Sequence, residues 1–199
     1  MSDGGNILKL ADLKIGYDKP LLQKVNAEFG TGITGIIGNN GKGKTTLLKC
    51  LCGLLRPMAG DITFKGKNVF KMLNQERARS ISFNFSSNPV SFPLSVYELV
   101  SMGRYPYTGN WAGLSDEDQK VVQGAMQVCG MSSFRDKKIT TLSDGERQKA
   151  FIAKSLAQQT SLMLFDEPTA FLDYSSKKYF FNLIKDIAAR QSKIILVSS

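Results

Sequence analysis

The fold of this chain is decided by one short stretch, Gly38-Asn39-Asn40-Gly41-Lys42-Gly43-Lys44-Thr45-Thr46. It matches the pattern G-x-x-x-x-G-K-[ST] of a phosphate-binding loop, in which a Gly-rich turn joins a strand to a helix. An apolar run at 32–37 precedes the stretch, and a run rich in Leu and Lys at 45–55 follows it. The sequence therefore predicts a buried parallel strand, a tight turn and a helix in succession.

The predicted loop contains the groups that bound phosphates need. Backbone N–H groups of the turn and the positive end of the helix dipole would both point at an anion. We expect Lys44 to act in catalysis by reaching the β- and γ-phosphates, and the Thr45 hydroxyl to bind Mg²⁺. We assign nucleotide binding to all nine residues: Gly38, Asn39, Asn40, Gly41, Lys42, Gly43, Lys44, Thr45 and Thr46. A Gly-rich turn can be only a turn, but the complete pattern with correct flanks makes that the weaker alternative.

Composition limits the class of protein. A chain of 199 residues with 42% apolar and 22% charged residues suits one globular α/β domain. Its 26 Lys and Arg against 17 Asp and Glu give +9, which suits partners with negative charge or simply a solvated basic face. No apolar run of transmembrane length and no signal-peptide pattern is found, and Cys50, Cys52 and Cys129 suggest reduced thiols of a cytosolic protein. The sequence contains no His, which excludes His-based catalysis within these residues.

The pattern of apolar residues changes along the chain. Alternation at 7–15 and 21–29 predicts two antiparallel strands joined by a turn, and residues 61–67 predict a further strand and turn. Tyr17 lies at the first turn, where it could stack on an adenine ring or merely pack. From about 87 to 158 helical patterns dominate, with helix starts at Ser95, Ser115 and Ser143, and we expect an inserted α-helical subdomain. The last third alternates strands and helices again, which indicates a mostly parallel core sheet.

Two carboxylates follow the predicted apolar strand at 162–165. In phosphate-loop proteins this position holds Mg²⁺, so we expect Asp166 to meet the metal and Glu167 to orient and deprotonate the attacking water. The alternative is a helix cap or a salt bridge after a strand. The stretch 142–148 precedes this strand, and its Ser143 and Gly145 would let a helix N-terminus bind a second anionic group.

Together these stretches resemble the ATP-binding subunit of ABC transporters. Residues 38–45 are similar to Walker A, 142–148 to the signature, 162–167 to Walker B and 170–173 to the D-loop. The resemblance implies the α/β fold of a P-loop NTPase, with an N-terminal antiparallel β-subdomain, over residues 1–199 as a single domain. It also implies ATP and Mg²⁺ as ligands, with Tyr17 stacking on adenine. In this family two subunits form a head-to-tail homodimer, so Ser143, Gly145 and Glu146 would bind the ATP held by the other copy.

A finer resemblance concerns the transported substrate. The run 96–107 and the Asp-Gly-Glu-Arg-Gln of the signature are similar to importers of iron-siderophore, haem or cobalamin type. This implies MgATP hydrolysis coupled to transmembrane permease subunits and a substrate-binding protein, on the cytoplasmic face of the membrane. We expect no nucleic-acid partner. The alternatives are a nucleotide-binding module with weak or no hydrolysis, and a soluble ABC ATPase outside transport, which the charge of +9 favours and the lack of a second cassette opposes.

Three departures from the family pattern bear on the expected activity. Ser86 or Ser87 occupies the place of the Gln that links the metal to the helical subdomain. The signature has Asp144 where Gly is commonest and Glu146 where Gln is, and both acids add negative charge near the expected γ-phosphate. The family's switch His follows the last strand, so we expect this sequence to be cut one residue short of it, after Ser199, and to lack the C-terminal helices.

Overall fold

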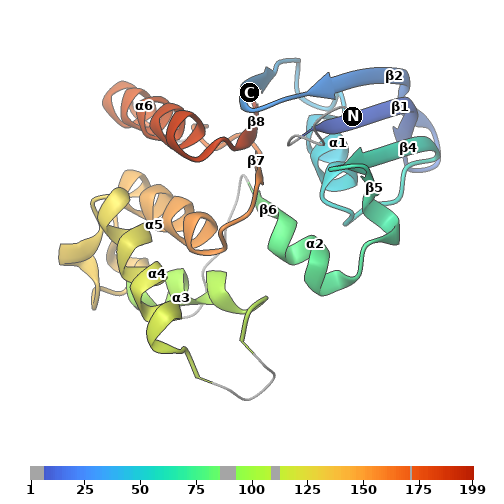
Figure 1. The fold of residues 1–199 in the computed structure, drawn as a ribbon. Helices are drawn as coiled ribbons and strands as arrows, with labels where there is room; N and C mark the ends of the chain where they lie inside the picture. Colours follow the sequence, from blue (N-terminus) through green and yellow to red (C-terminus); the bar gives the residue numbers. More distant parts are fainter. Residues whose placement is uncertain (1–6, 86–92, 109–112, 171) are drawn as a thin grey trace.

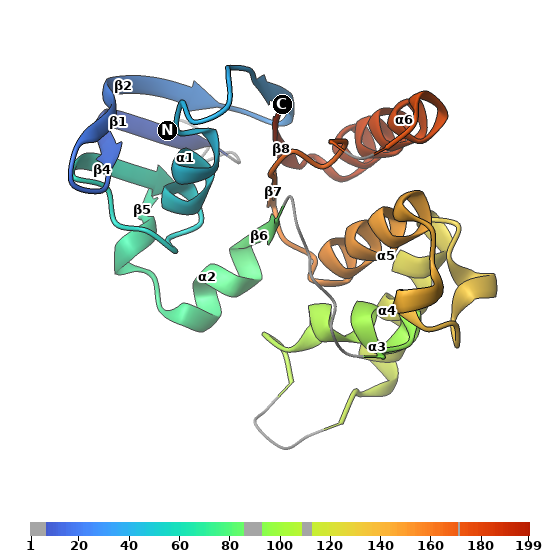
Figure 2. The same ribbon diagram turned by 180° about the vertical axis from the view of Figure 1, so that it is seen from behind.

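The structure is a computed structural model that describes residues 7–85, 93–108, 113–170 and 172–199 (Figure 1). It contains two four-stranded sheets and six α-helices in these residues. Figure 1 shows the strands β1, β2, β4 and β5 on one side of the molecule with helix α1, and helices α3, α4, α5 and α6 on the other. The strands β6, β7 and β8 run between these two parts, and Figure 2 shows the same arrangement from behind.

The first sheet is antiparallel and has the strand order β2-β1-β4-β5. Its strands are β1 (Leu8–Gly16), β2 (Pro20–Phe29), β4 (Ala59–Phe64) and β5 (Lys67–Asn68). β1 pairs with both β2 and β4, so Leu8 lies opposite Phe29 on one side and Phe64 on the other. This confirms the predicted N-terminal antiparallel unit.

The second sheet is parallel and has the order β3-β8-β7-β6. Its strands are β3 (Gly32–Ile36), β6 (Ile81–Asn84), β7 (Leu162–Phe165) and β8 (Ile194–Ser198). Every residue of β7 and β8 is buried, which explains why these two segments are apolar in sequence up to Ser198, the last residue of β8. Phe165 pairs with Val197, so the carboxyl ends of the two central strands lie side by side. The predicted parallel core sheet is therefore confirmed.

The parallel sheet separates two hydrophobic cores. Leu162 and Leu164 of β7 pack with α1 and the antiparallel sheet, while Met163 and Phe165 pack with α5 and α6. β8 alternates in the same way, because successive side chains of a strand point to opposite faces. Both faces of the central strands are thus covered, which fixes the position of their carboxyl ends.

Helix α1 (Lys44–Leu51) begins within the last three residues of the phosphate-loop sequence and ends earlier than the predicted residue 55. Gly53 adopts a left-handed φ of 75°, and the N–H groups of Leu54 and Leu55 both donate to the carbonyl of Lys49. A glycine in this conformation just after the last turn is a common way for a helix to stop. The predicted helix end was wrong because apolar residues continue past this glycine.

Five further α-helices lie in the described residues, three of them at the predicted starts. They are α2 (Asn74–Ser80), α3 (Val96–Ser101), α4 (Asp116–Val128), α5 (Asp144–Ala157) and α6 (Tyr174–Gln191). Short 3₁₀ turns lie at Val69–Lys71, Met102–Arg104, Ser132–Phe134 and Ile139–Thr141. Ser95, Ser115 and Ser143 each form a capping box, which confirms the three predicted starts. None of the helices described is long and apolar enough to cross a bilayer.

Candidate functional site

The candidate site lies at the carboxyl edge of the parallel sheet. The phosphate-loop sequence follows β3, Asp166 and Glu167 follow β7, and Ser198 is the last residue of β8. In parallel α/β sheets this edge is where ligands bind, because loops from neighbouring strands meet there. The structure thus brings together residues that are more than a hundred positions apart in sequence.

The side chain of Lys44 folds back onto the phosphate loop and contacts two of its residues. Its Nζ donates to the carbonyl oxygen of Gly38 at 2.6 Å and to Oδ1 of Asn40 at 3.4 Å. It also forms an ion pair with Oε1 of Glu167 at 3.3 Å. The Lys44 side chain is only 7% exposed, so the ammonium group is held in place and largely shielded from water. The two predicted catalytic side chains are therefore in direct contact in this structure.

Thr45 and Asp166 form the second pair of the site. The Thr45 Oγ1 lies 3.0 and 2.9 Å from the two carboxylate oxygens of Asp166. Asp166 is buried, and its other side-chain partner is the hydroxyl of Ser198 at 2.9 Å. Among the described residues no Lys or Arg pairs with this carboxylate. A buried charge of this kind is normally balanced by a cation, so the oxygen donors of Thr45 and Asp166 fit a bound Mg²⁺.

A pocket of about 180 Å³ opens between the loop and Glu167. It is lined by Leu21, Asn40, Gly41, Gly43, Lys44, Thr45, Thr46 and Glu167. Gly41 and Gly43 have φ values of 78° and 90°, which residues with a Cβ rarely adopt. A Cβ on Gly43 would also lie 3.2 Å from that of Leu21, so the turn is built for glycine. Of the nine predicted loop residues, Gly38, Asn39 and Lys42 do not line this pocket.

Tyr17 follows directly after β1 and is 60% exposed. It is not among the residues that line the pocket. Its ring is therefore not used in the packing of the core. The stacking role that we expect for Tyr17 stays a prediction.

The predicted signature residues lie at the start of α5. Ser143 donates both its backbone N–H and its hydroxyl to Oε2 of Glu146, each at 2.8 Å, and accepts from the N–H of Glu146 at 3.3 Å. The backbone hydrogen bond from Ser143 is the main cause that lowers the pKa of the Glu146 carboxyl. Asp144 pairs with Arg147 at 3.0 Å. The carboxylates of both unusual acids in the signature therefore have their polar partners within the first turn of α5.

Gly145 lets another element approach this helix start. A Cβ at this position would lie 2.9 Å from the Ser176 hydroxyl oxygen of α6. Asp173, which belongs to the predicted D-loop, caps α6 by accepting from the N–H of Ser176 at 2.8 Å. Figures 1 and 2 both place α5 on the far side of the molecule from α1. The structure therefore does not bring Ser143, Gly145 and Glu146 to the phosphate loop of the same chain.

Sequence reasoning missed two residues of the site, Leu21 and Ser198. Leu21 lines the pocket from β2, and its apolar character gave no signal of this. Ser198 contacts the carboxylate of Asp166 and the backbone N–H of Glu167, and the signal was a polar residue at the end of a buried parallel strand. Ser86 and Ser87, at the place of the expected Gln, lie outside the described residues, as does Phe171 of the predicted D-loop.

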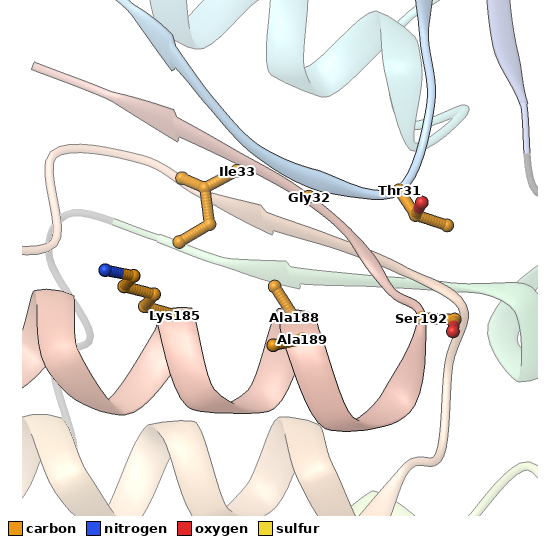
Figure 3. Close-up of a pocket in the computed structure, with 7 residues that line it drawn as sticks. All are labelled: Thr31, Gly32, Ile33, Lys185, Ala188, Ala189 and Ser192. Carbon is orange, nitrogen blue, oxygen red and sulfur yellow. The ribbon is translucent and has the colours of Figure 1, made fainter.

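A larger pocket of about 490 Å³ lies elsewhere, between strand β3 and the last turns of α6 (Figure 3). It is lined by Thr31, Gly32, Ile33, Lys185, Ala188, Ala189 and Ser192. Figure 3 shows Ile33 and Ala188 facing each other across this pocket. It contains one cationic side chain and no carboxylate, so the smaller pocket at the phosphate loop is the better candidate for chemistry.

Comparison with known proteins identifies a family that this chain resembles along most of its length. The sequence model of the ABC transporter family matches residues 22–170. The iron(3+)-hydroxamate import ATP-binding protein FhuC of Bacillus subtilis is 35% identical over 194 residues, which cover 96% of this chain and 72% of that protein. The ferric enterobactin transport ATP-binding protein FepC of Escherichia coli is 36% identical over 182 residues, which cover 90% and 67%. The structure of cbiO1 from Clostridium perfringens, part of the ABC transporter complex cbiONQ, is similar with a TM-score of 0.86 and 28% identity, covering 98% of this chain and 78% of that one.

Proposed function

Because this chain belongs to the ABC transporter family, whose ATP-binding subunits hydrolyse ATP, we propose that it is the subunit that powers an importer. The observation that carries the proposal is the meeting of Lys44, Thr45, Asp166 and Glu167 at one pocket. These residues provide a phosphate-binding cation, two oxygen donors for a metal and a carboxylate base. No other pocket described combines these groups.

The phosphate loop binds the triphosphate of ATP. Backbone N–H groups at the start of α1 point toward the phosphates, and Lys44 neutralises charge on the β- and γ-phosphates. Thr45 and Asp166 hold Mg²⁺, which supplies charge neutralisation on the phosphate oxygens. No group of three or more Asp, Glu or Cys suited to a metal is found in the described part of the chain. This agrees with Mg²⁺, which commonly uses one or two protein ligands together with substrate phosphates.

Glu167 acts on the attacking water. Its carboxylate orients the water and accepts its proton while the water oxygen bonds to the γ-phosphorus. The bond from that phosphorus to the β–γ bridging oxygen breaks, which leaves ADP and inorganic phosphate. In this structure the Glu167 carboxylate is paired with Lys44. When phosphates take over Lys44, Glu167 becomes free to serve as the base.

A second copy of the chain completes each site. Ser143, Gly145 and Glu146 of one copy face the ATP bound at the phosphate loop of the other, in a head-to-tail homodimer. The separation of α5 from α1 within one chain supports this arrangement, since the two parts of the site cannot then come from the same copy. Tyr17, which is exposed after the end of β1, stacks on the adenine ring.

The transported substrate is an iron-siderophore, haem or cobalamin. The names of two relatives support this choice, since FhuC is an iron(3+)-hydroxamate import protein and FepC a ferric enterobactin transport protein. The subunit works with transmembrane permease subunits and a substrate-binding protein, at the cytoplasmic face of the membrane. Residues 1–199 form one ATP-binding domain, which contains a helical subdomain at about 87–158.

The test is phosphate release by the purified protein with MgATP. We expect the wild type to hydrolyse ATP and Glu167→Gln to turn over at least ~100-fold more slowly, because a positioned general base contributes about that much. Glu28→Gln is the matched control, since Glu28 pairs with Lys9 on an exposed strand and the change removes the same charge. Turnover of Glu167→Gln at the wild-type rate would contradict the role of the base. A wild type that binds ATP without turnover would favour the non-hydrolysing alternative.

A further inference from the structure

The last residue of β8, Ser198, contacts both Asp166 and Glu167. The parallel register pairs Phe165 with Val197, so the next residues along, Asp166 and Ser198, are neighbours at the carboxyl edge. Ser198 is 1% exposed, and its hydroxyl has no access to bulk water. A buried hydroxyl at this place must find its hydrogen-bond partners within the site.

Both partners of Ser198 belong to the predicted Walker B residues. Its hydroxyl donates to Oδ1 of Asp166 at 2.9 Å. The same oxygen accepts from the backbone N–H of Glu167 at 2.8 Å. A serine hydroxyl can do both at once because it has one proton and two lone pairs. The Ser198 side chain is therefore hydrogen-bonded to the carboxylate of Asp166 and to the backbone of Glu167.

The backbone of Glu167 adopts a conformation that requires stabilising contacts. Its φ is 44°, a left-handed conformation that is unfavourable for a residue with a Cβ. Strained positions of this kind persist when the surrounding structure holds them, and they are concentrated at active sites. The hydrogen bond from Glu167 N–H to Ser198 is one contact that holds it. This conformation aims the Glu167 carboxylate at the pocket, where it meets Lys44 at 3.3 Å.

The carboxylate of Asp166 is held from two sides. Thr45 approaches it from α1 and Ser198 from β8. Without Ser198, the carboxylate would keep only the Thr45 hydroxyl and could rotate about its last torsion, which is broad for Asp. The hydrogen bond from Ser198 therefore fixes the orientation of the Asp166 carboxylate toward Thr45. The geometry of the two proposed metal ligands depends on this orientation.

We infer that Ser198 is a positioning residue for ATP hydrolysis, which holds the metal ligand Asp166 and the base Glu167 in their working geometry. The inference rests on the proposed function, since positioning is defined by the reaction. Ser198 touches neither phosphate nor water in this role and acts only through its two neighbours. Its loss should therefore change turnover and the Mg²⁺ requirement more than nucleotide binding.

The test compares Ser198→Ala and Ser198→Thr with Ser82→Ala. Ser82 is a matched control, because it is also buried in the parallel sheet, its hydroxyl accepts from Thr160 at 3.0 Å, and it lies outside the site. Steady-state phosphate release gives kcat and KM for ATP over a range of Mg²⁺ concentrations, and thermal unfolding gives Tm. We expect Ser198→Ala to lower kcat by about 10- to 100-fold and to raise the Mg²⁺ concentration for half-maximal rate. Its KM for ATP should stay within about threefold of the wild type, its Tm should match that of Ser82→Ala, and Ser198→Thr should recover part of kcat.

The outcomes separate the two proposals. If Ser198→Ala has the kcat and Mg²⁺ dependence of Ser82→Ala while Glu167→Gln is inactive, the inference about Ser198 is overturned and the proposed function stands. A kcat loss that follows a lower Tm, without a change in Mg²⁺ dependence, also overturns it, because the hydroxyl would then only stabilise the fold. If the wild type does not hydrolyse ATP, the proposed function and this inference are overturned together. If Glu167→Gln hydrolyses ATP at the wild-type rate, the role of the base and this inference are overturned.

Discussion

The ion pair between Lys44 and Glu167 predicts that removing the base strengthens nucleotide binding. In this structure the Glu167 carboxylate lies 3.3 Å from the ammonium group that should bind phosphates. A nucleotide must therefore displace Glu167 from Lys44, and the free energy of that contact is subtracted from the binding free energy. Glu167→Gln removes the competing charge and should lower the Kd for ADP.

The size of the gain follows from the distance and the burial. Two unit charges at this separation attract by about 5 kcal/mol at an effective dielectric constant of ~20. The Glu167 side chain is 33% exposed, so water recovers much of this when the pair breaks. A net value of about 1–2 kcal/mol lies between measured exposed and buried pairs. The Kd for ADP should then fall by about 5- to 30-fold.

The assay is titration of a fluorescent ADP, or calorimetry with ADP, in the presence of Mg²⁺. ADP is chosen because it is not hydrolysed and has no γ-phosphate, so repulsion between that phosphate and Glu167 cannot contribute. Glu28→Gln carries the same charge change away from the loop and should leave the Kd unchanged. The gain should shrink at high salt, since a partly exposed pair is screened. An unchanged or weaker affinity of Glu167→Gln for ADP would refute the competition.

Two further predictions concern stability. The Ser115 hydroxyl, and after it the Arg104 guanidinium at 2.8 Å, lowers the pKa of the Asp118 carboxyl. The ionised carboxylate therefore stabilises the folded protein above the unfolded pKa of about 4, and this stabilisation is lost as pH falls toward the folded pKa. Asp118→Asn should therefore lower the free energy of unfolding by ~3 kcal/mol at pH 7, measured by denaturant titration. The difference from the wild type should shrink below pH ~4, and a difference independent of pH would contradict this. Gly103→Ala should destabilise by about 1–3 kcal/mol in the same titration, because its Cβ would lie 2.3 Å from a backbone oxygen of α5. The control Gly124→Ala, in the open face of α4, should instead stabilise by about 0.5–1 kcal/mol, and equal effects of the two changes would contradict the packing argument.

The elements that the sequence predicted are those whose signals are local. The loop at 38–46 fixes a turn through its glycines, and Ser95, Ser115 and Ser143 mark helix starts through hydrogen bonds that span only three residues. The end of α1 was predicted wrongly because a single glycine, Gly53, stops the helix while apolar residues continue. Here a local backbone preference outweighed the apolar pattern from which the helix was extended.

The contacts that the sequence could not predict depend on strand register. Asp166 and Glu167 were predicted to be functional from their place after a strand, but the contact of Ser198 with them could be found only once β7 and β8 were aligned in parallel. A shift of one residue would point Ser198 to the other face of the sheet. Similarly, Asp144 and Glu146 suggested unfavourable charge near a phosphate, and only the structure gives them partners in Arg147 and Ser143.

The two halves of the proposed site share one electrostatic property. At the phosphate loop, the Glu167 carboxylate occupies the ammonium group of Lys44. At the start of α5, the Glu146 carboxylate occupies the N–H and hydroxyl of Ser143, the donors that an anion at this helix end would use. In the proposed dimer, ATP would therefore compete with an internal carboxylate on each side. The affinity for ATP then depends on the difference between the contacts that ATP makes and the internal carboxylate contacts that it replaces. A change of Glu to Gln on either side should therefore alter binding through the free state of the protein as well as through the bound state.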